Sequence, residues 1–586
     1  MILRRRLFVV TVLLLAIAAS RLFRLDVTAT ELRVDEFWSI WQTFGTPADI
    51  LRWTPYDWTP LYYLTLGFWH SVAGLHPIVL RLLSVFVFLI GAAALYRAVL
   101  HWRDDRAAML VTLAYAALGY TLFLSTELRG YAFLLGLYPL ALWLALRYFE
   151  KPRVGRAVAL ALALAAMVYV SLTSVTALLM LGVFLLLVYR RRALRGWLPA
   201  LIALGLVLPE ALRKLDLAVG RVDALESQTL PPLVEALAAL YRDYAGIGFV
   251  VWVALFALAS AAMLLGRRER LTFGLLLWVL TPVALYALNP VIGLFGARYA
   301  WWVTLGLALW VGLGLAYLPR VGQFVTGGIL AALMLLPLPL DDYQIAGAPL
   351  GQTFRWLTQN ARWGDVIVLD PDCDCVEPDA LDYLTRAYFP RGFPYVTDPT
   401  GYRRVWYISD TEERDPDTLA AVARSRRESI FFGPSYALFR LYEAPPDVQG
   451  IPFENGMRFH GVETPDLPGP LVLHEGETFR VRLWWSVDAP PDRDYSVGLH
   501  VYREGVLIAQ DDSAPRVVDL PPETSQWQTG HYYVEDRSIT LPYPTSRGDY
   551  ALALVVYFWQ DGERVSAPDA TTDNVLPLAT LQVKAW

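Results

Sequence analysis

The chain has 586 residues, of which 56% are hydrophobic and 18% are charged. This apolar fraction is too high for an ordinary soluble protein and the length is too great for one domain, so we expect a multidomain membrane protein. The net charge of −5 comes without a basic stripe, which argues against nucleic acid as a partner. Apolar blocks fill the chain up to about residue 340, and charged, Pro-rich patterns follow, which predicts a membrane half and a water-soluble half.

The N-terminus is basic and leads into an apolar run over 7–20, which fits either a signal peptide or a first transmembrane helix. Leu22 and Phe23 prolong the run, and this favours a retained helix. In both cases the positive end stays in the cytoplasm and the next segment lies outside.

Two carboxylates, Asp35 and Glu36, follow this first segment, and an aromatic, Pro-rich run over 56–63 comes soon after. A plain linker needs neither feature. We therefore interpret 31–63 as a reaction site at the outer membrane surface. The simpler alternative is a helix N-terminal charge pair that the helix dipole favours.

Ten further segments are apolar and near the roughly 20 residues needed to cross the hydrocarbon core. With the first they make about eleven spans, an odd number that exports the soluble half. The run 61–75 is left out because it carries Trp69, His70 and Ser71, which suit an amphipathic interfacial helix. The ten segments are 78–100, 107–124, 130–149, 156–172, 174–189, 196–212, 246–266, 271–288, 299–318 and 321–340.

The arginines support this count, because the positive-inside rule then holds for every basic loop. The cytoplasmic loops are 103–106, 151–156, 190–195, 267–270 and 319–320. The same count places the Asp35–Glu36 pair outside, together with the segments 125–130, 214–245 and 289–298. The long segment 214–245 fits either a lid over the site or a disordered loop. The expected location is the cell membrane, with a cytoplasmic N-terminus.

Two outer segments carry arginines where positive-inside statistics disfavour them. Arg129 lies between Glu127 and Tyr131, and Arg298 precedes Tyr299 at the start of a late span. A single arginine at a helix end can merely extend to lipid headgroups. Two on the outer face favour anion binding, and a phosphate suits the bidentate guanidinium fork.

The order of these motifs resembles that of the polytopic lipid-linked sugar transferases of the GT-C fold. It is most similar to the branch with protein O-mannosyltransferases and the aminoarabinose transferase of lipid A. The shared features are Asp-Glu after the first helix, Pro-Leu-Tyr-Tyr at 60–63, Glu-x-Arg-x-Tyr at 127–131, and Arg-Tyr at 298–299. The likeness covers about 1–340, and the order and common sidedness of the motifs carry it.

The resemblance implies that Asp35 is the catalytic base or organises a metal and the acceptor, with Glu36 as its partner. The family has His-Pro before Pro-Leu-Tyr-Tyr, whereas this chain has Trp58 and Thr59, so the role of that histidine is left without a residue here. The implied substrate-binding residues are Asp57, Tyr62, Tyr63, Glu127, Arg129, Tyr131, Arg298 and Tyr299.

The chemistry of such a transfer suits these residue types. A polyprenyl-phosphate sugar already has an anionic leaving group, so the reaction needs one base and no strong acid. Asp35 can accept the proton of an acceptor hydroxyl as it attacks the anomeric carbon, while Arg129 and Arg298 stabilise the departing phosphate. A single displacement inverts the anomeric configuration.

Metal use is left open. Asp35, Glu36 and His70 could together hold a divalent ion such as Mg²⁺, Mn²⁺ or Zn²⁺. A lone histidine on an interfacial helix is more often simply an interfacial residue.

The soluble half divides near Pro445 and Pro446. We predict three domains: a transmembrane module at 1–345, an extracytoplasmic α/β domain at 346–446 with a mainly parallel sheet, and an antiparallel β-sandwich at 447–586. The α/β elements are helices at 352–361, 379–388 and 415–427 and strands at 365–370, 404–408, 429–432 and 437–442. The sandwich strands are 477–487, 495–510, 530–541, 550–559 and 578–584.

Side chains of two kinds stand out in the soluble half. Its tryptophans, among them Trp484, Trp485, Trp527 and Trp559, either stack on sugars or, as we favour for most of them, fill the sandwich core. The only cysteines, Cys373 and Cys375, are one residue apart, which allows an awkward short-loop disulfide or a metal site.

Three functions remain in competition. The first is a glycosyltransferase that moves a sugar from a polyprenyl-phosphate donor to a protein, lipid or glycan acceptor on the outer face. The second is a transporter of lipid-linked sugars, although the polar residues cluster at one surface and not at mid-membrane. The third is a non-catalytic membrane anchor that displays a carbohydrate-binding or adhesive sandwich.

Overall fold

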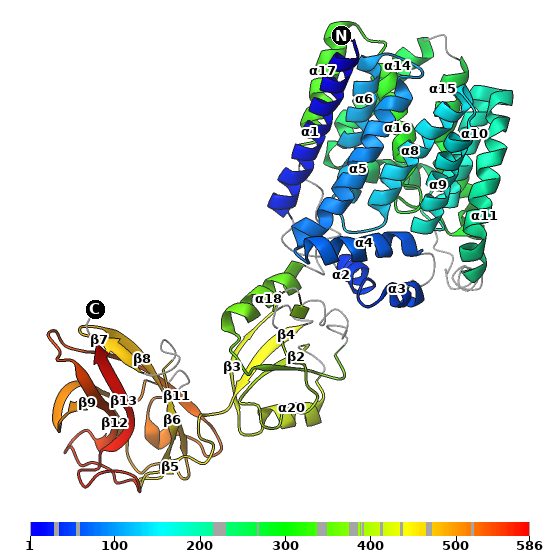
Figure 1. Ribbon diagram of the computed structural model, residues 1–586. Coiled ribbons are helices and arrows are strands. Elements are labelled where there is room, and N and C mark those ends of the chain that lie inside the picture. The colour runs from blue at the N-terminus through cyan, green and yellow to red at the C-terminus, as the bar shows by residue number, and fades with distance from the viewer. Residues whose placement is uncertain are drawn as a thin grey trace. The chain divides into compact units, whose positions relative to one another are not determined.

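Figure 1 shows the computed structural model of the chain. It describes residues 2–28, 34–53, 59–214, 230–265, 269–336, 348–373, 385–386, 388–389, 392–410, 414–433, 437–464, 471–516 and 521–584. The chain forms two compact units, one made of Met1–Gln352 with Pro378–Tyr388 and the other of Thr353–Glu377 with Phe389–Trp586. The three domain boundaries expected from the sequence remain a prediction.

The first unit is a bundle of apolar helices, and a helix lies over each segment that was expected to cross the membrane. These helices are α1 (Ile2–Thr28), α5 (Pro77–Val99), α6 (Asp105–Ala117), α7 (Gly119–Leu124), α8 (Tyr131–Glu150), α9 (Val154–Val170), α10 (Ser174–Tyr189), α11 (Trp197–Arg213), α14 (Phe249–Leu265), α15 (Glu269–Ile292), α16 (Val303–Leu315) and α17 (Arg320–Leu333). Within the described residues, six stretches are long and apolar enough to span a membrane, and α9, α16 and α17 are shorter apolar helices. The protein is therefore a multi-pass membrane protein.

Three short helices lie across one end of this bundle, opposite the N-terminus of α1 (Figure 1). They are α2 (Val34–Trp41), α3 (Pro47–Trp53) and α4 (Pro60–Ala73). Pro60 is the first residue of α4, where its missing N–H costs no helical hydrogen bond. The Thr59 hydroxyl donates to the Val168 carbonyl of α9 at 2.8 Å, which fixes α4 to the bundle. As expected for 61–75, α4 does not belong to the spanning helices.

Two segments of the bundle differ from the expectation. The span expected at 107–124 breaks at Leu118, between α6 and α7. A Cβ at Gly119 would lie 2.8 Å from the Cα of Gly246, so only a glycine allows this close approach of two backbones. The segment 214–245, expected as a lid or a disordered loop, contains the helix α13 (Leu233–Ala245), followed by the 3₁₀ turn η2 (Gly246–Gly248).

The second unit begins with a four-stranded sheet, and its expected parallel character was wrong. The strands are β1 (Val366–Leu369), β2 (Arg404–Ser409), β3 (Arg427–Phe432) and β4 (Leu438–Glu443), in the order β1-β2-β4-β3. Only the β1–β2 pairing is parallel. The connection from β3 to β4 is too short for a crossover, so these strands pair antiparallel. Helices α18 (Ala348–Asn360) and α20 (Pro416–Ala423) accompany the sheet, and most of the helix expected at 379–388 lies outside the described residues.

The rest of the second unit is the expected β-sandwich. One sheet has the order β10-β9-β12-β13-β7 and the other has the order β11-β8-β6-β5. All pairings are antiparallel except that of β13 with β7. The strands are β5 (Ile451–Pro452), β6 (Met457–Glu463), β7 (Val472–His474), β8 (Thr478–Val487), β9 (Tyr495–Arg503), β10 (Val506–Ser513), β11 (Tyr533–Thr540), β12 (Gly548–Phe558) and β13 (Leu576–Lys584).

The tryptophans of the sandwich divide as we favoured. Trp484, Trp485 and Trp527 are fully buried, whereas Trp559 is exposed. Cys373 takes part in a disulfide, so its sulfur is not a free thiolate ligand for a metal, and Cys375 lies outside the described residues.

Candidate active site

Glu36 of α2 is fully buried and is held by two distant parts of the chain. The Arg81 guanidinium of α5 donates from Nε to Glu36 Oε1 at 2.8 Å and from Nη2 to Oε2. The Leu128 amide, in the loop between α7 and α8, also donates to Oε1 at 2.7 Å. Both carboxylate oxygens therefore accept hydrogen bonds within the protein, as a buried charge requires.

The loop between α7 and α8 brings Glu127 and Arg129 to this pair, and both side chains are buried. The Ser84 hydroxyl of α5 donates to the Glu127 carbonyl at 2.7 Å. Arg129 Nη1 lies 3.4 Å from the Ser39 hydroxyl of α2. The loop is thus fixed between α2 and α5, with an acid and a guanidinium beside the Glu36–Arg81 pair.

A second buried arginine supports the loop from the side of α1. Arg21 donates from Nε to the Ser125 hydroxyl at 2.8 Å and from Nη2 to the Ala116 carbonyl at 2.7 Å. Its guanidinium also stacks 4.9 Å from the centre of the Phe88 ring. These contacts stabilise the start of the loop that carries Glu127 and Arg129.

Tyr62 of α4 points its hydroxyl toward the same charges. The ring is fully buried and packs edge-on against Phe133 of α8 at 5.3 Å. Burial raises the pKa of the hydroxyl well above its ordinary value, and the charges of Arg129, Glu36 and Glu127 all act on it. Among the described residues the Tyr62 hydroxyl has no hydrogen-bond partner. A buried donor without a partner indicates a position where a ligand or water completes the site.

Arg298 and Tyr131 lie near this cluster. The charges of Glu127 and Arg298 both act on the Tyr120 hydroxyl of α7, and so does Tyr131. Arg298 is exposed in the loop before α16, and Tyr299 follows it. Residues far apart in sequence, from α2 to the loop before α16, therefore converge at one end of the bundle.

Three residues that the sequence predicted for the site are not among those that the structure brings together. The side chain of Asp35, in α2, and the whole of Asp57 lie outside the described residues. His70 of α4 packs its ring 5.8 Å from Phe44. The described part of the chain contains no group of three His, Cys, Asp or Glu residues that could hold a metal. The divalent metal expected at Asp35, Glu36 and His70 stays a prediction.

Arg81 and Arg21 hold the cluster together, and neither was expected from the sequence. Arg81 is a charge near the start of a 23-residue apolar helix, and such intramembrane charges usually have a buried partner or a function. That signal was present in the sequence. The sequence did not indicate that Glu36 is its partner, because 45 residues separate the two.

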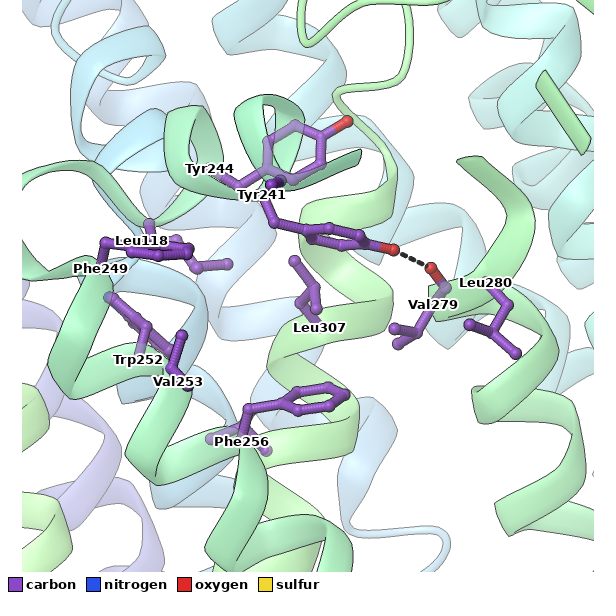
Figure 2. Close-up of a pocket in the computed structure, with 13 residues that line it drawn as sticks. Leu118, Tyr241, Tyr244, Phe249, Trp252, Val253, Phe256, Val279, Leu280 and Leu307 are labelled. Carbon is purple, nitrogen blue, oxygen red and sulfur yellow. Dashed lines mark hydrogen bonds between the residues drawn. The ribbon is translucent and has the colours of Figure 1, made fainter. Parts of the chain in front are cut away.

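An apolar cavity of about 360 Å³ lies beside this region (Figure 2). Its lining includes Tyr241 and Tyr244 of α13 and Phe256 of α14. The Tyr244 hydroxyl donates to the Ala300 carbonyl at 2.8 Å, two residues from Arg298, and its ring contacts Tyr120 at 5.8 Å. Tyr244 therefore links the cavity lining to Tyr120, on which the charges of Glu127 and Arg298 act. Its volume falls in the usual range of about 300–1,000 Å³ for small-molecule sites.

The protein is a polytopic membrane protein of the GT-C fold. It has helical spans, crosswise helices at one end of the bundle and a β-rich C-terminal part. Among solved structures the chain is similar to ArnT from Cupriavidus metallidurans in the apo state, with a TM-score of 0.51 and 15% sequence identity. ArnT bound to undecaprenyl phosphate gives a TM-score of 0.50 and 17% identity. Both matches cover 74% of this chain and 97% of the ArnT chain, which is more than residues 1–345 alone can supply.

The resemblance expected from the motif order is thus confirmed at the level of the fold, which is similar to that of ArnT. No family model and no curated protein sequence matches the chain.

Proposed function

We propose that the protein is an integral membrane glycosyltransferase that moves a sugar from a polyprenyl-phosphate donor to an acceptor hydroxyl at the outer face of the cell membrane. The observation that carries the proposal is the convergence of Glu36, Glu127, Arg129 and Arg298 at one end of the bundle, next to an apolar cavity. A lipid phosphate suits both features, because its anionic headgroup binds cations and its apolar tail binds an apolar wall. The ArnT neighbour was solved with undecaprenyl phosphate bound, which supports this ligand class.

The proposed reaction is one displacement. The oxygen of the acceptor hydroxyl attacks the anomeric carbon, the bond from that carbon to the phosphate oxygen breaks, and polyprenyl phosphate leaves with the electron pair. Asp35 takes the hydroxyl proton. Arg129 and Arg298 stabilise the charge on the leaving phosphate, and the product has inverted anomeric configuration. Glu36 has a different role here from the one first expected, because its oxygens are held by Arg81 and Leu128; it positions α2, which carries Asp35.

The proposed orientation follows from the ends of the bundle. Arg6 pairs with Asp105 at 3.1 Å at the N-terminal end, and α2, α3 and α4 lie at the opposite end (Figure 1). The N-terminal end also carries the exposed arginines that follow α10. The positive-inside rule places that end in the cytoplasm and the candidate site outside.

The test uses the full-length protein in lipid vesicles with a panel of labelled polyprenyl-phosphate sugars, and a membrane extract supplies acceptors. We expect one donor to release polyprenyl phosphate and label the extract, and Asp35→Asn to lower this rate by about 10²–10⁴. Movement of the intact donor across the vesicle, unchanged in Asp35→Asn, would identify a transporter instead. No donor turnover together with glycan binding by the sandwich would support the anchor alternative.

A further inference from the structure

A groove of about 650 Å³ runs along α9, α10 and α11, from Gly196 and Trp197 at the end of the bundle opposite to the candidate active site toward Val168 and Val207. Helix α11 relates the groove to the candidate site. Its last residue, Arg213, donates to the Leu51 carbonyl of α3 at 3.0 Å. The first residue, Trp197, lines the groove and is 16 residues, or about 24 Å, away along the helix. The Trp197 end of the groove is therefore distant from α3, whereas Val168 in its lining accepts a hydrogen bond from Thr59, the residue before α4.

The walls of the groove are apolar and firmly held. Helix α9 packs on α11 through small residues such as Ala161 and Ala203, and the Tyr169 hydroxyl donates to the Leu206 carbonyl at 2.9 Å. On the other side Trp102 donates to the hydroxyl of Tyr189, the last residue of α10, at 2.6 Å. Gly182 of α10 lines the groove, and an added Cβ there would meet no atom within 4 Å.

The end of the groove carries a concentration of positive charge. The 3₁₀ turn η1 (Arg190–Gly196) follows α10 directly, and its residues Ala193, Leu194 and Gly196 line the groove. Its arginines are exposed, and among the described residues none of them forms a side-chain hydrogen bond or an ion pair. No acidic residue is found among the described groove-lining residues. The four arginines are Arg190, Arg191, Arg192 and Arg195.

A second cavity shows that this charge pattern is not general at this end. A cavity of about 580 Å³ near the start of α6 contains Arg106 and Arg320, but Asp104 and Asp105 line it too. There two aspartates offset part of the charge of three arginines, since Arg6 lines this cavity as well. At η1, within the part of the chain that the structure describes, no acidic residue lines the groove beside the arginines.

We propose that this groove binds an anionic diacyl phospholipid, with its acyl chains along α9, α10 and α11 and its phosphate at the arginines of η1. Charge complementarity selects the headgroup, because each arginine near an anionic lipid contributes about 1 kcal/mol, or a factor of about five in affinity. The apolar walls accept the chains. Trp197, exposed at the rim, suits the membrane interface, where tryptophan is enriched.

The experiment compares two photoactivatable lipids with identical acyl chains, phosphatidylglycerol and phosphatidylcholine, in vesicles that contain the full-length protein. Mass spectrometry of the cross-linked peptides locates each lipid. We expect phosphatidylglycerol to label 182–197 at least about fivefold more than phosphatidylcholine. Equal labelling by the two lipids would overturn the proposal, because the headgroup would then not be recognised.

Matched variants test the groove and the charge separately. Gly182→Leu fills the groove and should abolish the preferential labelling, whereas Gly205→Leu, at an equally open glycine of α11 outside the groove lining, should retain it. The double variant Arg191→Gln with Arg192→Gln should lose the preference, and Arg106→Gln with Arg320→Gln should keep it. Unchanged labelling in the Arg191/Arg192 variant would contradict the proposal even if Gly182→Leu failed to fold. Displacement of phosphatidylglycerol by undecaprenyl phosphate at equal concentration would also contradict it.

Discussion

Arg81 and Glu36 form a buried bidentate ion pair that joins α5 to α2, and the Leu128 amide shares one of the same carboxylate oxygens. The pair ties the short helix that carries Asp35 to the loop that carries Glu127 and Arg129. Its stability therefore controls how well the candidate site is organised.

Loss of Arg81 should destabilise the protein more than loss of both partners. Arg81→Leu leaves the Glu36 carboxylate buried without its guanidinium, and we expect the free energy of unfolding to fall by about 3–5 kcal/mol. The double variant Arg81→Leu with Glu36→Leu should recover most of this loss. Thermal unfolding in a neutral detergent measures both. A loss below about 1 kcal/mol for Arg81→Leu would show that Glu36 is not a structural partner.

Tyr62→Phe should change ligand-free stability and donor binding in opposite directions. The buried hydroxyl has no hydrogen-bond partner among the described residues, so its removal should leave the unfolding temperature unchanged or raise it. If a donor phosphate completes this site, the same variant should bind undecaprenyl phosphate about 5- to 10-fold more weakly. Binding and unfolding of the two proteins are measured side by side. A large loss of stability would show that the hydroxyl has a structural partner in the ligand-free protein.

Arg298→Ala should weaken binding of undecaprenyl phosphate. A charge-assisted hydrogen bond to a phosphate contributes about 1.5–3 kcal/mol, so the dissociation constant should rise roughly 10- to 100-fold. Arg320→Ala is the control, because Arg320 is also exposed but lies at the other end of the bundle. Equal effects of the two variants would mean that Arg298 acts only through general charge.

The cavity beside Tyr241 and Tyr244 offers a test of the lipid tail. Ala238 lines this cavity and its neighbour in α13, Ala239, does not, although both are exposed. Ala238→Trp should fill the cavity and weaken binding of undecaprenyl phosphate, and Ala239→Trp should not. Inorganic phosphate competition should be unaffected by either change. If both tryptophans act alike, the tail lies elsewhere.

Stability of the sandwich should depend on pH through His460. Its Nδ1 faces the Asp447 carbonyl at 2.7 Å and its Nε2 lies 2.8 Å from the Ser486 hydroxyl. Burial lowers the pKa of His460 below its ordinary 6.5. The unfolded chain therefore binds the proton more readily, so stability is retained above pH 6.5 and falls as the pH is lowered toward the folded-state pKa.

This loss of sandwich stability is measured by amide hydrogen exchange of the β6 peptide between about pH 5 and pH 8, in the wild type and in His460→Asn. The exchange rates are corrected for the pH dependence of intrinsic amide exchange. Parallel profiles for the two proteins would assign the pH dependence to other groups.

Hydropathy and charge in the sequence were sufficient to predict the helical spans, because lipid exposure imposes long apolar runs on the chain. They were not sufficient for the break at Leu118, which depends on a backbone contact between Gly119 and Gly246. Strand β6 was missed because its register shifts between Phe459 and Val462, so its side chains do not alternate cleanly.

The sequence predicted the candidate site as a set of residue types on one side of the membrane. Glu127, Arg129 and Arg298 belong to this set, and their roles stay predictions. The pairing of Glu36 with Arg81 could not, since it depends on how α2 packs against α5. That packing changes the expected role of Glu36 from chemistry to positioning.

The Glu36 contacts also set an order for biogenesis. During synthesis α2 emerges before the helix that carries Arg81, and residue 128 emerges later still. An unpaired carboxylate remains in water in preference to an apolar interior. We therefore expect α2 to dock only after α5 and the loop that carries Leu128 have been inserted, and a nascent chain that still lacks them has no assembled candidate site.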